Sequence, residues 1–165
     1  MLQFDPAEIT ALAARYQYDD DGEAQALGAT AAARGFYTRE EFLTVCAWKT
    51  KRSKSKAVAN PDAAVEEQTR ASFAADDEGE RMDALISLEG VGVPTASTLL
   101  QFAFPDRYPI LDVRALEALG QRGRSVYSVS YWLSYLEECR RLAVRVGVSI
   151  RTLDKALWQW SKERG

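Results

Sequence analysis

The sequence of 165 residues contains no histidine and only two cysteines, Cys46 and Cys139. Without histidine, the chain has no Ser-His or Cys-His nucleophile system and lacks the ligand of most zinc sites. Two cysteines so far apart supply neither a disulfide framework nor the four closely spaced thiolates of an iron–sulfur cluster. We expect both to be buried apolar positions. Any acid–base chemistry must therefore use Asp, Glu, Lys, Tyr or Cys side chains.

The sequence also has no apolar stretch of the roughly 18–20 residues that span a bilayer. It begins without the basic region and apolar core of a signal peptide. Its hydrophobic fraction of 47% is typical of a globular chain, and its length suits one domain. We therefore expect a cytoplasmic monomer with no membrane partner, associated with the nucleoid if the protein is bacterial.

Helical patterns fill the chain, whereas alternating runs are short and lack the turns of a β-hairpin. Capping signals at Asp5 and Thr38 predict helix starts, and the first helix is expected to run to about Tyr18. Asn60, before Pro61, is expected to cap a later helix. Further helices are expected at about residues 22–34, 62–75, 78–88, 112–119, 131–146 and 149–160. The pattern predicts an all-α, single-domain helical fold over residues 1–165.

Residues 80–104 contain two apolar helical runs separated by Gly90-Val91-Gly92. Glycines on both sides of one aliphatic residue predict a very tight turn, and Pro94 suits the first turn of the second helix. The first amides of that helix would be unpaired, which makes them a site for a DNA phosphate. The pattern is typical of a helix-hairpin-helix motif and predicts that double-stranded DNA is bound through Gly90, Val91, Gly92 and Thr95.

The loop over residues 105–114 holds Pro105 and Pro109 and reaches Asp112. The order of hairpin, proline-containing loop and aspartate resembles the HhH-GPD superfamily of DNA base-excision glycosylases. The match is to the endonuclease III-like, adenine and 8-oxoguanine glycosylases, and it covers residues 85–114. Asp112 follows the first hairpin glycine at the distance of the family's catalytic aspartate. The resemblance therefore implies that Asp112 is the key carboxylate of a glycosylase.

One family feature is replaced in this sequence. Bifunctional relatives carry a lysine two residues after the second hairpin glycine, and that position is Pro94 here. The resemblance therefore implies a monofunctional, hydrolytic enzyme. Lys49 is a candidate substitute for the missing lysine, provided that its amine lies within a few ångströms of Asp112 and that burial lowers its pKa.

Cofactors are expected to be absent, with one exception that the resemblance brings. In relatives, carbonyl groups of the hairpin bind a monovalent cation, Na⁺ or K⁺, that bridges to a DNA phosphate. Transfer of those positions onto this sequence gives the backbone carbonyls of Ile86, Leu88 and Val91. An iron–sulfur cluster is not expected.

The net charge is −3, but the charges are unevenly distributed, and residues 49–56 hold five cations and no acid. This basic segment is either a solvated loop or a phosphate contact through Lys51, Arg52 and Lys54. Trp48, beside it, is either core or the wall of a pocket for a flipped base. Arg114 would either reach a phosphate or pair with an acid. Trp158 is either a second packing contact or an exposed aromatic side chain near the site.

Three hypotheses about function follow from these patterns. The first is a DNA glycosylase that flips a damaged base and hydrolyses its N-glycosidic bond. The second is a non-catalytic helix-hairpin-helix module that binds duplex DNA and uses Asp112 as a helix N-cap. The third is a helical interaction protein that does not bind DNA. If residues 49–56, the hairpin and Asp112 line one groove, the DNA hypotheses hold; if they lie on opposite faces, the enzyme hypothesis fails.

Overall fold

The computed structural model describes residues 1–18, 21–50 and 55–165. Over these ranges it contains helices and no strand, which confirms the all-α prediction. None of these helices combines the length and the apolar character that a bilayer crossing requires. The helices are a short 3₁₀ helix at Pro6–Glu8 and α1 (Ile9–Arg15), α2 (Asp21–Arg34), α3 (Arg39–Lys49), α5 (Asp62–Ala74), α6 (Glu78–Ile86), α7 (Val93–Ala103), α8 (Val113–Ala118), α9 (Val129–Val146) and α10 (Ile150–Lys162).

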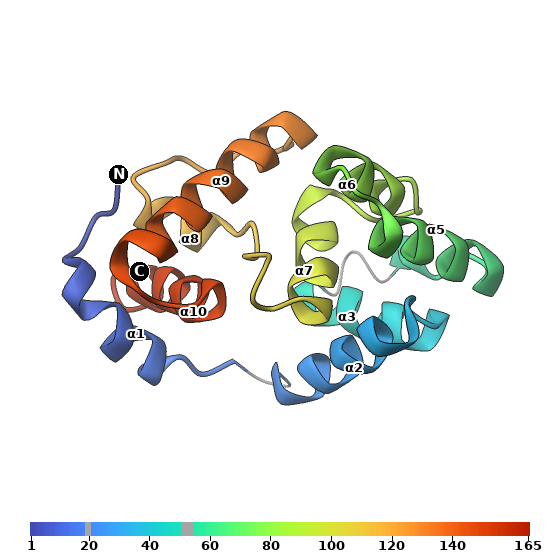
Figure 1. Ribbon diagram of the computed structural model, residues 1–165, viewed down its shortest axis with the longest axis horizontal. Coiled ribbons are helices and arrows are strands. Elements are labelled where there is room, and N and C mark those ends of the chain that lie inside the picture. Colours follow the sequence, from blue (N-terminus) through green and yellow to red (C-terminus); the bar gives the residue numbers. More distant parts are fainter. Residues whose placement is uncertain (19–20, 51–54) are drawn as a thin grey trace.

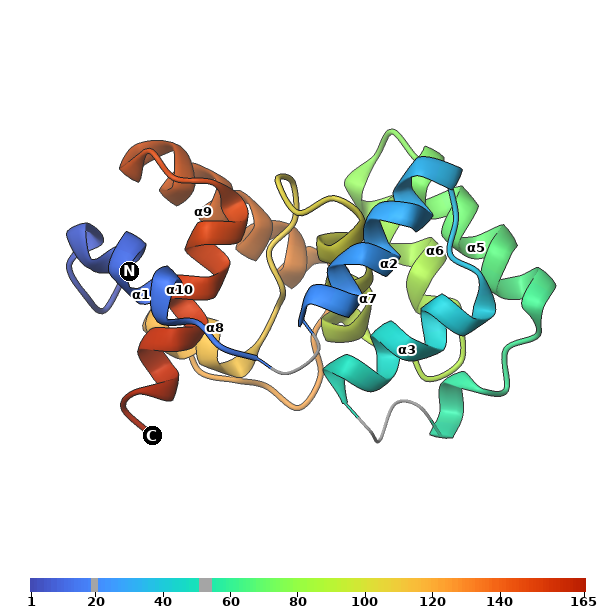
Figure 2. The same ribbon diagram turned by 90° about the horizontal axis from the view of Figure 1, so that it is seen from below.

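The helices form two groups that lie side by side (Figure 1). One group contains α1, α8, α9 and α10, and the other contains α2, α3, α5, α6 and α7. Figure 2 shows the chain crossing from the first group to the second after α1 and returning through the segment between α7 and α8. The buried apolar side chains form one continuous cluster that includes residues of both groups, among them Cys46 and Cys139. Residues of both crossing segments line one pocket where the groups adjoin.

Local capping signals are confirmed at most helix starts. Asp5 and Thr38 each form the predicted capping box, with Glu8 and Glu41 as the returning side chains. Ser149 accepts a hydrogen bond from the third residue of its helix, as expected for an N-cap. Helix α9 begins two residues earlier than predicted because Ser128 caps it.

The end of the first helix differs from the prediction. Helix α1 stops at Arg15, because Tyr16 takes φ −60° and ψ 124° and leaves the helical path. The rings of Tyr16 and Tyr18 then pack against Trp158 of α10 and Trp48 of α3. These tertiary contacts outweigh the local helical pattern, so the segment becomes the first crossing between the groups.

Asn60 was predicted to cap α5, and this was wrong. Pro61 takes the N-cap position in an extended conformation, and no side chain caps that helix. The Asn60 side chain points instead to the α6–α7 turn (residues 87–92). It accepts a hydrogen bond from the Glu89 amide at 2.9 Å and donates one to the Glu89 carbonyl at 2.9 Å. It also donates to the Ala57 carbonyl at 2.8 Å, so it ties the end of the basic segment to the turn.

The two glycines of the α6–α7 turn have different roles. Gly90 has φ +75°, and a Cβ atom there would lie 2.7 Å from the Ala57 nitrogen and 2.8 Å from Lys56 Cβ. The turn therefore needs a glycine both for its backbone angles and for its close approach to residues 56–57. Gly92 has an ordinary extended conformation and is the N-cap residue of α7. The approach at Gly90 brings the turn and the end of the basic segment into contact.

Candidate functional site

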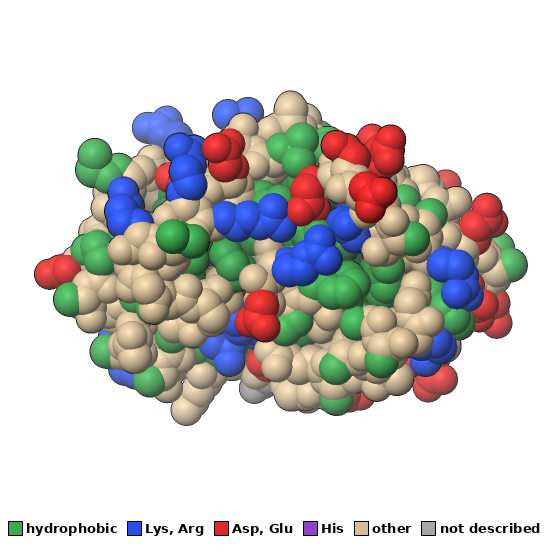
Figure 3. All heavy atoms as spheres, in the orientation of Figure 1, with side chains coloured by type: hydrophobic (Ala, Val, Ile, Leu, Met, Phe, Trp, Pro, Cys, Tyr) green, Lys and Arg blue, Asp and Glu red, His purple; other side chains and the backbone are tan. Residues whose placement is uncertain are grey.

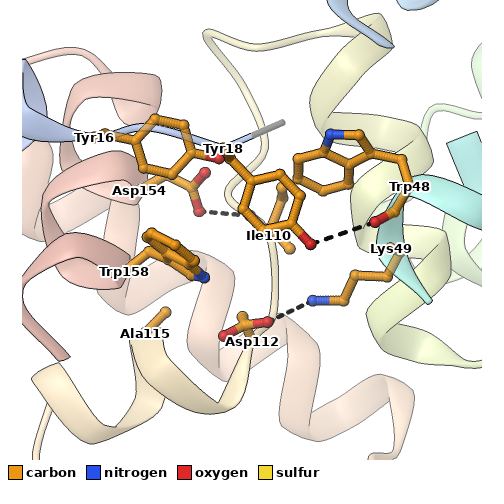
Figure 4. A pocket seen from close by; sticks show the side chains of 9 residues that line it. All are labelled: Tyr16, Tyr18, Trp48, Lys49, Ile110, Asp112, Ala115, Asp154 and Trp158. Atoms are coloured by element: carbon orange, nitrogen blue, oxygen red, sulfur yellow. Dashed lines mark hydrogen bonds and ion pairs between the residues drawn. The ribbon is translucent and has the colours of Figure 1, made fainter. Parts of the chain in front are cut away.

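A pocket lies where the two helix groups adjoin (Figure 4). Its volume is about 60 Å³. The walls come from the crossing after α1, the end of α3, the loop before α8, α8 itself and α10. The lining residues are Tyr16, Tyr18, Trp48, Lys49, Ile110, Asp112, Ala115, Asp154 and Trp158.

Asp112 makes two polar contacts in this pocket. It is the N-cap of α8, and its Oδ1 accepts a hydrogen bond from the Arg114 amide at 2.9 Å. Its Oδ2 lies 2.7 Å from Nζ of Lys49 at the end of α3. The predicted cap is therefore present, and the amine of Lys49 lies as close to Asp112 as the sequence hypothesis required.

The environment of Asp112 favours its ionised form. Burial by itself would raise the pKa of Asp112, because a charge is less well solvated there. The Lys49 ammonium and the Arg114 amide outweigh that effect, and the net result is a lowered pKa. Asp112 is therefore a partly desolvated carboxylate at neutral pH, which interacts more strongly with a nearby positive charge than a fully solvated one does.

The loop that carries Asp112 is held by side chains from three helices. The Ile110 amide donates to Asp154 of α10 at 2.9 Å, and the Ile110 carbonyl accepts from the Tyr135 hydroxyl of α9 at 2.8 Å. The Leu111 amide donates to Oγ of Ser97 in α7 at 2.9 Å. All three contacts are buried, so the direction of the loop is fixed from both helix groups.

Four aromatic side chains wall the pocket. The Tyr18 ring lies between the two tryptophans, with centroid distances of 4.5 Å to Trp48 and 5.5 Å to Trp158. Trp48 also packs edge-on against Phe102 at 4.7 Å, so it is both core and pocket wall. Trp158 contacts Tyr16, another lining residue, edge-on at 5.2 Å. Both alternatives raised for Trp48 therefore describe part of its surroundings, whereas Trp158 is half-buried and not the exposed aromatic of one alternative.

An open groove runs along the α6–α7 turn. Its other side is the segment 124–127, which includes Arg124, and the end of the basic segment contributes Lys56. Lys49 lines both this groove and the pocket, so the two are contiguous at that residue. The face seen in Figure 3 carries Lys, Arg, Asp and Glu side chains interspersed, which gives no extended surface of one sign on that side.

The groove gathers most of the predicted DNA contacts that can be located. Residues 86–95 line it, which includes Gly90, Val91, Gly92 and Thr95 and the carbonyl positions Ile86 and Leu88. Lys51, Arg52 and Lys54 lie outside the described residues. Of the three parts named in the condition set from the sequence, the turn and the described part of the basic segment line this groove, whereas Asp112 lines the adjoining pocket.

The position of Arg114 differs from the one expected for a phosphate contact. Its guanidinium lies 5.7 Å from the centre of the Trp158 ring, and its Nη1 is 3.5 Å from the Ser161 hydroxyl. It does not line the groove along the α6–α7 turn. The side chain therefore packs against α10. Its contacts are within the protein, as in the alternative of a pair with an acid, but the partners are an aromatic ring and a hydroxyl.

The sequence analysis missed five lining residues: the apolar Ile110 and Ala115, and three with polar groups, Tyr16, Tyr18 and Asp154. The tyrosines continue a helical pattern, and only partners on other helices reveal their position. Asp154 reads as a polar residue of an amphipathic helix, and its partner Ile110 is 44 positions away. Over residues 1–18, 21–50 and 55–165, no three Cys, Asp or Glu side chains are grouped as a metal site would require.

Comparisons with protein-family models, curated proteins and solved structures found no match to this chain. The resemblance to the HhH-GPD glycosylases therefore rests on the residues of the chain itself. The geometry adds an ionised aspartate in an aromatic pocket, next to a groove formed at a helix–turn–helix junction. Those elements are the basis for a proposal about function.

Proposed function

We propose that the protein is a DNA glycosylase that hydrolyses the N-glycosidic bond of a flipped base, and that α6, the α6–α7 turn and α7 form its helix-hairpin-helix motif. The observation that carries this proposal is the shared position of Lys49. It pairs with Asp112 inside the aromatic pocket and also lines the groove along the turn. A strand bound in the groove would have the reactive carboxylate within reach.

Cleavage of an N-glycosidic bond gives the sugar oxocarbenium character as the base departs. A fixed carboxylate stabilises this positive charge and orients the attacking water. Asp112 has the required charge, because its pKa is lowered despite its burial. Its hydrogen bond from the Arg114 amide and its rigid loop hold the carboxylate in one place, which favours a developing charge over the neutral ground state.

A base inside a duplex must leave the stack before it can reach Asp112. The present volume of about 60 Å³ is too small for a base, so a lining group has to move. Tyr18 is the natural group, because its side chain is 38% exposed and lies outside any helix. When Tyr18 turns outward, Trp48 and Trp158 present flat apolar surfaces on which a base stacks.

The duplex would be held by the groove. The start of α7 has no side-chain cap, so the first amides there, those of Gly92, Val93 and Thr95, are suited to a phosphate. Lys56 and Arg124 add positive charge at the same groove. A Na⁺ or K⁺ ion held by the carbonyls of Ile86, Leu88 and Val91 would supply further neutralisation of the phosphate charge.

The test is base excision by the purified protein and its Asp112→Asn variant, which keeps a good N-cap but removes the charge. Duplexes carrying 8-oxoguanine, uracil, alkylated adenine or mismatched adenine are incubated and scored with and without alkali. We expect alkali-dependent cleavage of one duplex, lost in the variant. The contrary result is strand cleavage without alkali, together with a protein–DNA imine that borohydride traps in the wild type but not in Lys49→Met. That result would instead make Lys49 an amine nucleophile.

The second candidate function is a non-catalytic module that binds duplex DNA. It is favoured by the double structural use of Asp112, which caps α8 and pairs with Lys49 in a pocket that is nearly filled. Salt-sensitive binding to every duplex without excision, equal in wild type and Asp112→Asn, would support this function. Absence of any duplex binding would favour a helical interaction protein.

A further inference from the structure

A second carboxylate, Asp154, lies in the pocket with only 7% of its side chain exposed. Oδ1 of Asp154 accepts the hydrogen bond from the Ile110 amide at 2.9 Å, and Oδ2 accepts one from Nη1 of Arg151 at 2.7 Å. Burial raises the pKa of Asp154, but both of its oxygens accept hydrogen bonds from N–H donors. Its role in the pocket is therefore that of an acceptor.

Ile110, whose amide donates to Asp154, is only two residues from Asp112 in the sequence. Of the three side chains that hold the loop, Tyr135 and Ser97 lie outside the pocket lining, whereas Asp154 belongs to it. Asp154 is also the only charged one, and hydrogen bonds to a charged acceptor are stronger than those between neutral groups. The bond from the Ile110 amide to Asp154 is thus the one of the three that uses a charged acceptor and a pocket-lining side chain.

Arg151 extends this restraint to the other helix group. Its guanidinium donates to Asp154 and also pairs with Asp21 at the start of α2. It lies over the ring of Tyr16 at 5.4 Å as well. The chain Asp21–Arg151–Asp154–Ile110 therefore connects the crossing that carries the pocket tyrosines to the loop that carries the carboxylate.

We propose that Asp154 is a positioning residue for Asp112, which acts by fixing the Ile110 amide and thereby the direction of the Asp112 carboxylate in the pocket. This inference rests on the proposed glycosylase function. Displacement of a reacting group by about 1 Å can lower a rate by about 100-fold. The proposal requires the oxygen of Asp154 that accepts the hydrogen bond from the Ile110 amide, rather than the negative charge of Asp154 alone.

Two substitutions separate the acceptor from the charge. Asp154→Asn retains a side-chain oxygen for the Ile110 amide, while Asp154→Ala removes it. Under single-turnover conditions we expect Asp154→Ala to excise the base roughly 10- to 100-fold more slowly than wild type. Asp154→Asn should keep a rate within about threefold of wild type, and both should bind the duplex with a Kd within about twofold, because the groove is unchanged.

A second readout does not depend on activity. Amide hydrogen exchange, measured by NMR without DNA, should be slow at Ile110 in wild type and Asp154→Asn and fast at Ile110 in Asp154→Ala. The Leu111 amide donates its hydrogen bond to Ser97, so in Asp154→Ala it should remain protected longer than the Ile110 amide. If Asp154→Ala does not fold, Ser97→Ala releases the neighbouring amide of the same loop and should lower the excision rate by a smaller factor, with unchanged Kd.

Three results would overturn the inference. Equal losses in Asp154→Asn and Asp154→Ala would show that the charge, not the acceptor, is needed. An unchanged rate in Asp154→Ala with a freely exchanging Ile110 amide would show that the restraint is irrelevant to the chemistry. If the wild type excises no base at all, the proposed function itself fails and the positioning role with it, whereas the exchange data still report the hydrogen bond.

Discussion

The Lys49 ammonium, at the end of α3, lies 2.7 Å from Oδ2 of Asp112, at the start of α8. The two residues are 63 positions apart in sequence and belong to different helix groups. Lys49 is 13% exposed and Asp112 is 25% exposed, so solvent screens this pair less than an ion pair on the open surface. The pair therefore joins the two groups at the pocket and sets the charge state of Asp112.

Replacement of Lys49 by Met should raise the pKa of Asp112, because burial then acts without the opposing ammonium. In the wild type the folded-state pKa of Asp112 is below its ordinary value. The ionised carboxylate therefore stabilises the fold above about pH 4, and this stabilisation is lost as pH falls through the lowered pKa. In the variant the folded-state pKa moves up towards the ordinary value, so this acid-dependent loss of stability should be smaller. A ¹³C NMR titration of Asp112 and acid unfolding curves measure both shifts.

A matched control for that experiment is Arg145→Met. Arg145 also ends a helix and is exposed on α9, and within the described residues it forms no ion pair. Its replacement changes the net charge by the same amount and should leave the titration of Asp112 in place. A shift of equal size in both variants would mean that Lys49 acts only through net charge and not through its contact.

Gly90→Ala should destabilise the fold more than Gly35→Ala. Both glycines have positive φ, +75° and +96°, which costs about 1–2 kcal/mol for an alanine. A Cβ atom at Gly35 meets nothing within 4 Å, whereas one at Gly90 clashes with the backbone at Ala57. The difference between the two free energies of unfolding, measured in urea, isolates the contact between turn and basic segment. Equal losses would argue against that contact.

Asn60→Ala should loosen the α6–α7 turn. The substitution leaves the amide and carbonyl of Glu89 without their side-chain partner, which costs about 1–3 kcal/mol where such groups are shielded from water. Thr30→Ala, which removes an exposed bond to the Ala26 carbonyl on α2, should change stability by less than about 0.5 kcal/mol. Urea unfolding compares the two, and faster amide exchange at Glu89 would identify the turn as the part released.

Lys56→Ala and Arg124→Ala should weaken duplex binding without favouring any sequence. Both residues line the groove, and each cation that neutralises a phosphate contributes about one unit to the slope of log K against log salt. We expect each variant to lower that slope by about 1, while the exposed Arg145→Ala should not change it. Unaltered slopes for both groove variants would place the duplex elsewhere or remove it as a partner.

The helix starts were predictable because their signals are local. Asp5, Thr38 and Asp112 each cap a helix through a contact within three residues, which the sequence displays directly. Asn60 shows the limit of that reasoning. Its neighbour Pro61 gives the appearance of a cap, but a partner 29 positions away takes the side chain.

The pocket was predictable only in part. Trp48, Lys49 and Asp112 were marked by a family spacing and by a basic segment, and the structure brings them together. Tyr18 and Asp154 carry no such mark, since their partners lie on helices distant in sequence. A position that looks ordinary along one helix can thus be specified entirely by what the opposite helix group presents.

The packing of α1 against α10 sets an order of assembly on the ribosome. Helices α2 to α7 can pack together once residues up to Ala103 have emerged, but α10, the main packing partner of α1 among the described helices, is made last. At roughly 5–20 residues per second, synthesis from α7 to the end of α10 takes several seconds. During that interval the nascent chain has the α6–α7 turn but lacks the α10 residues of the pocket, Asp154 and Trp158.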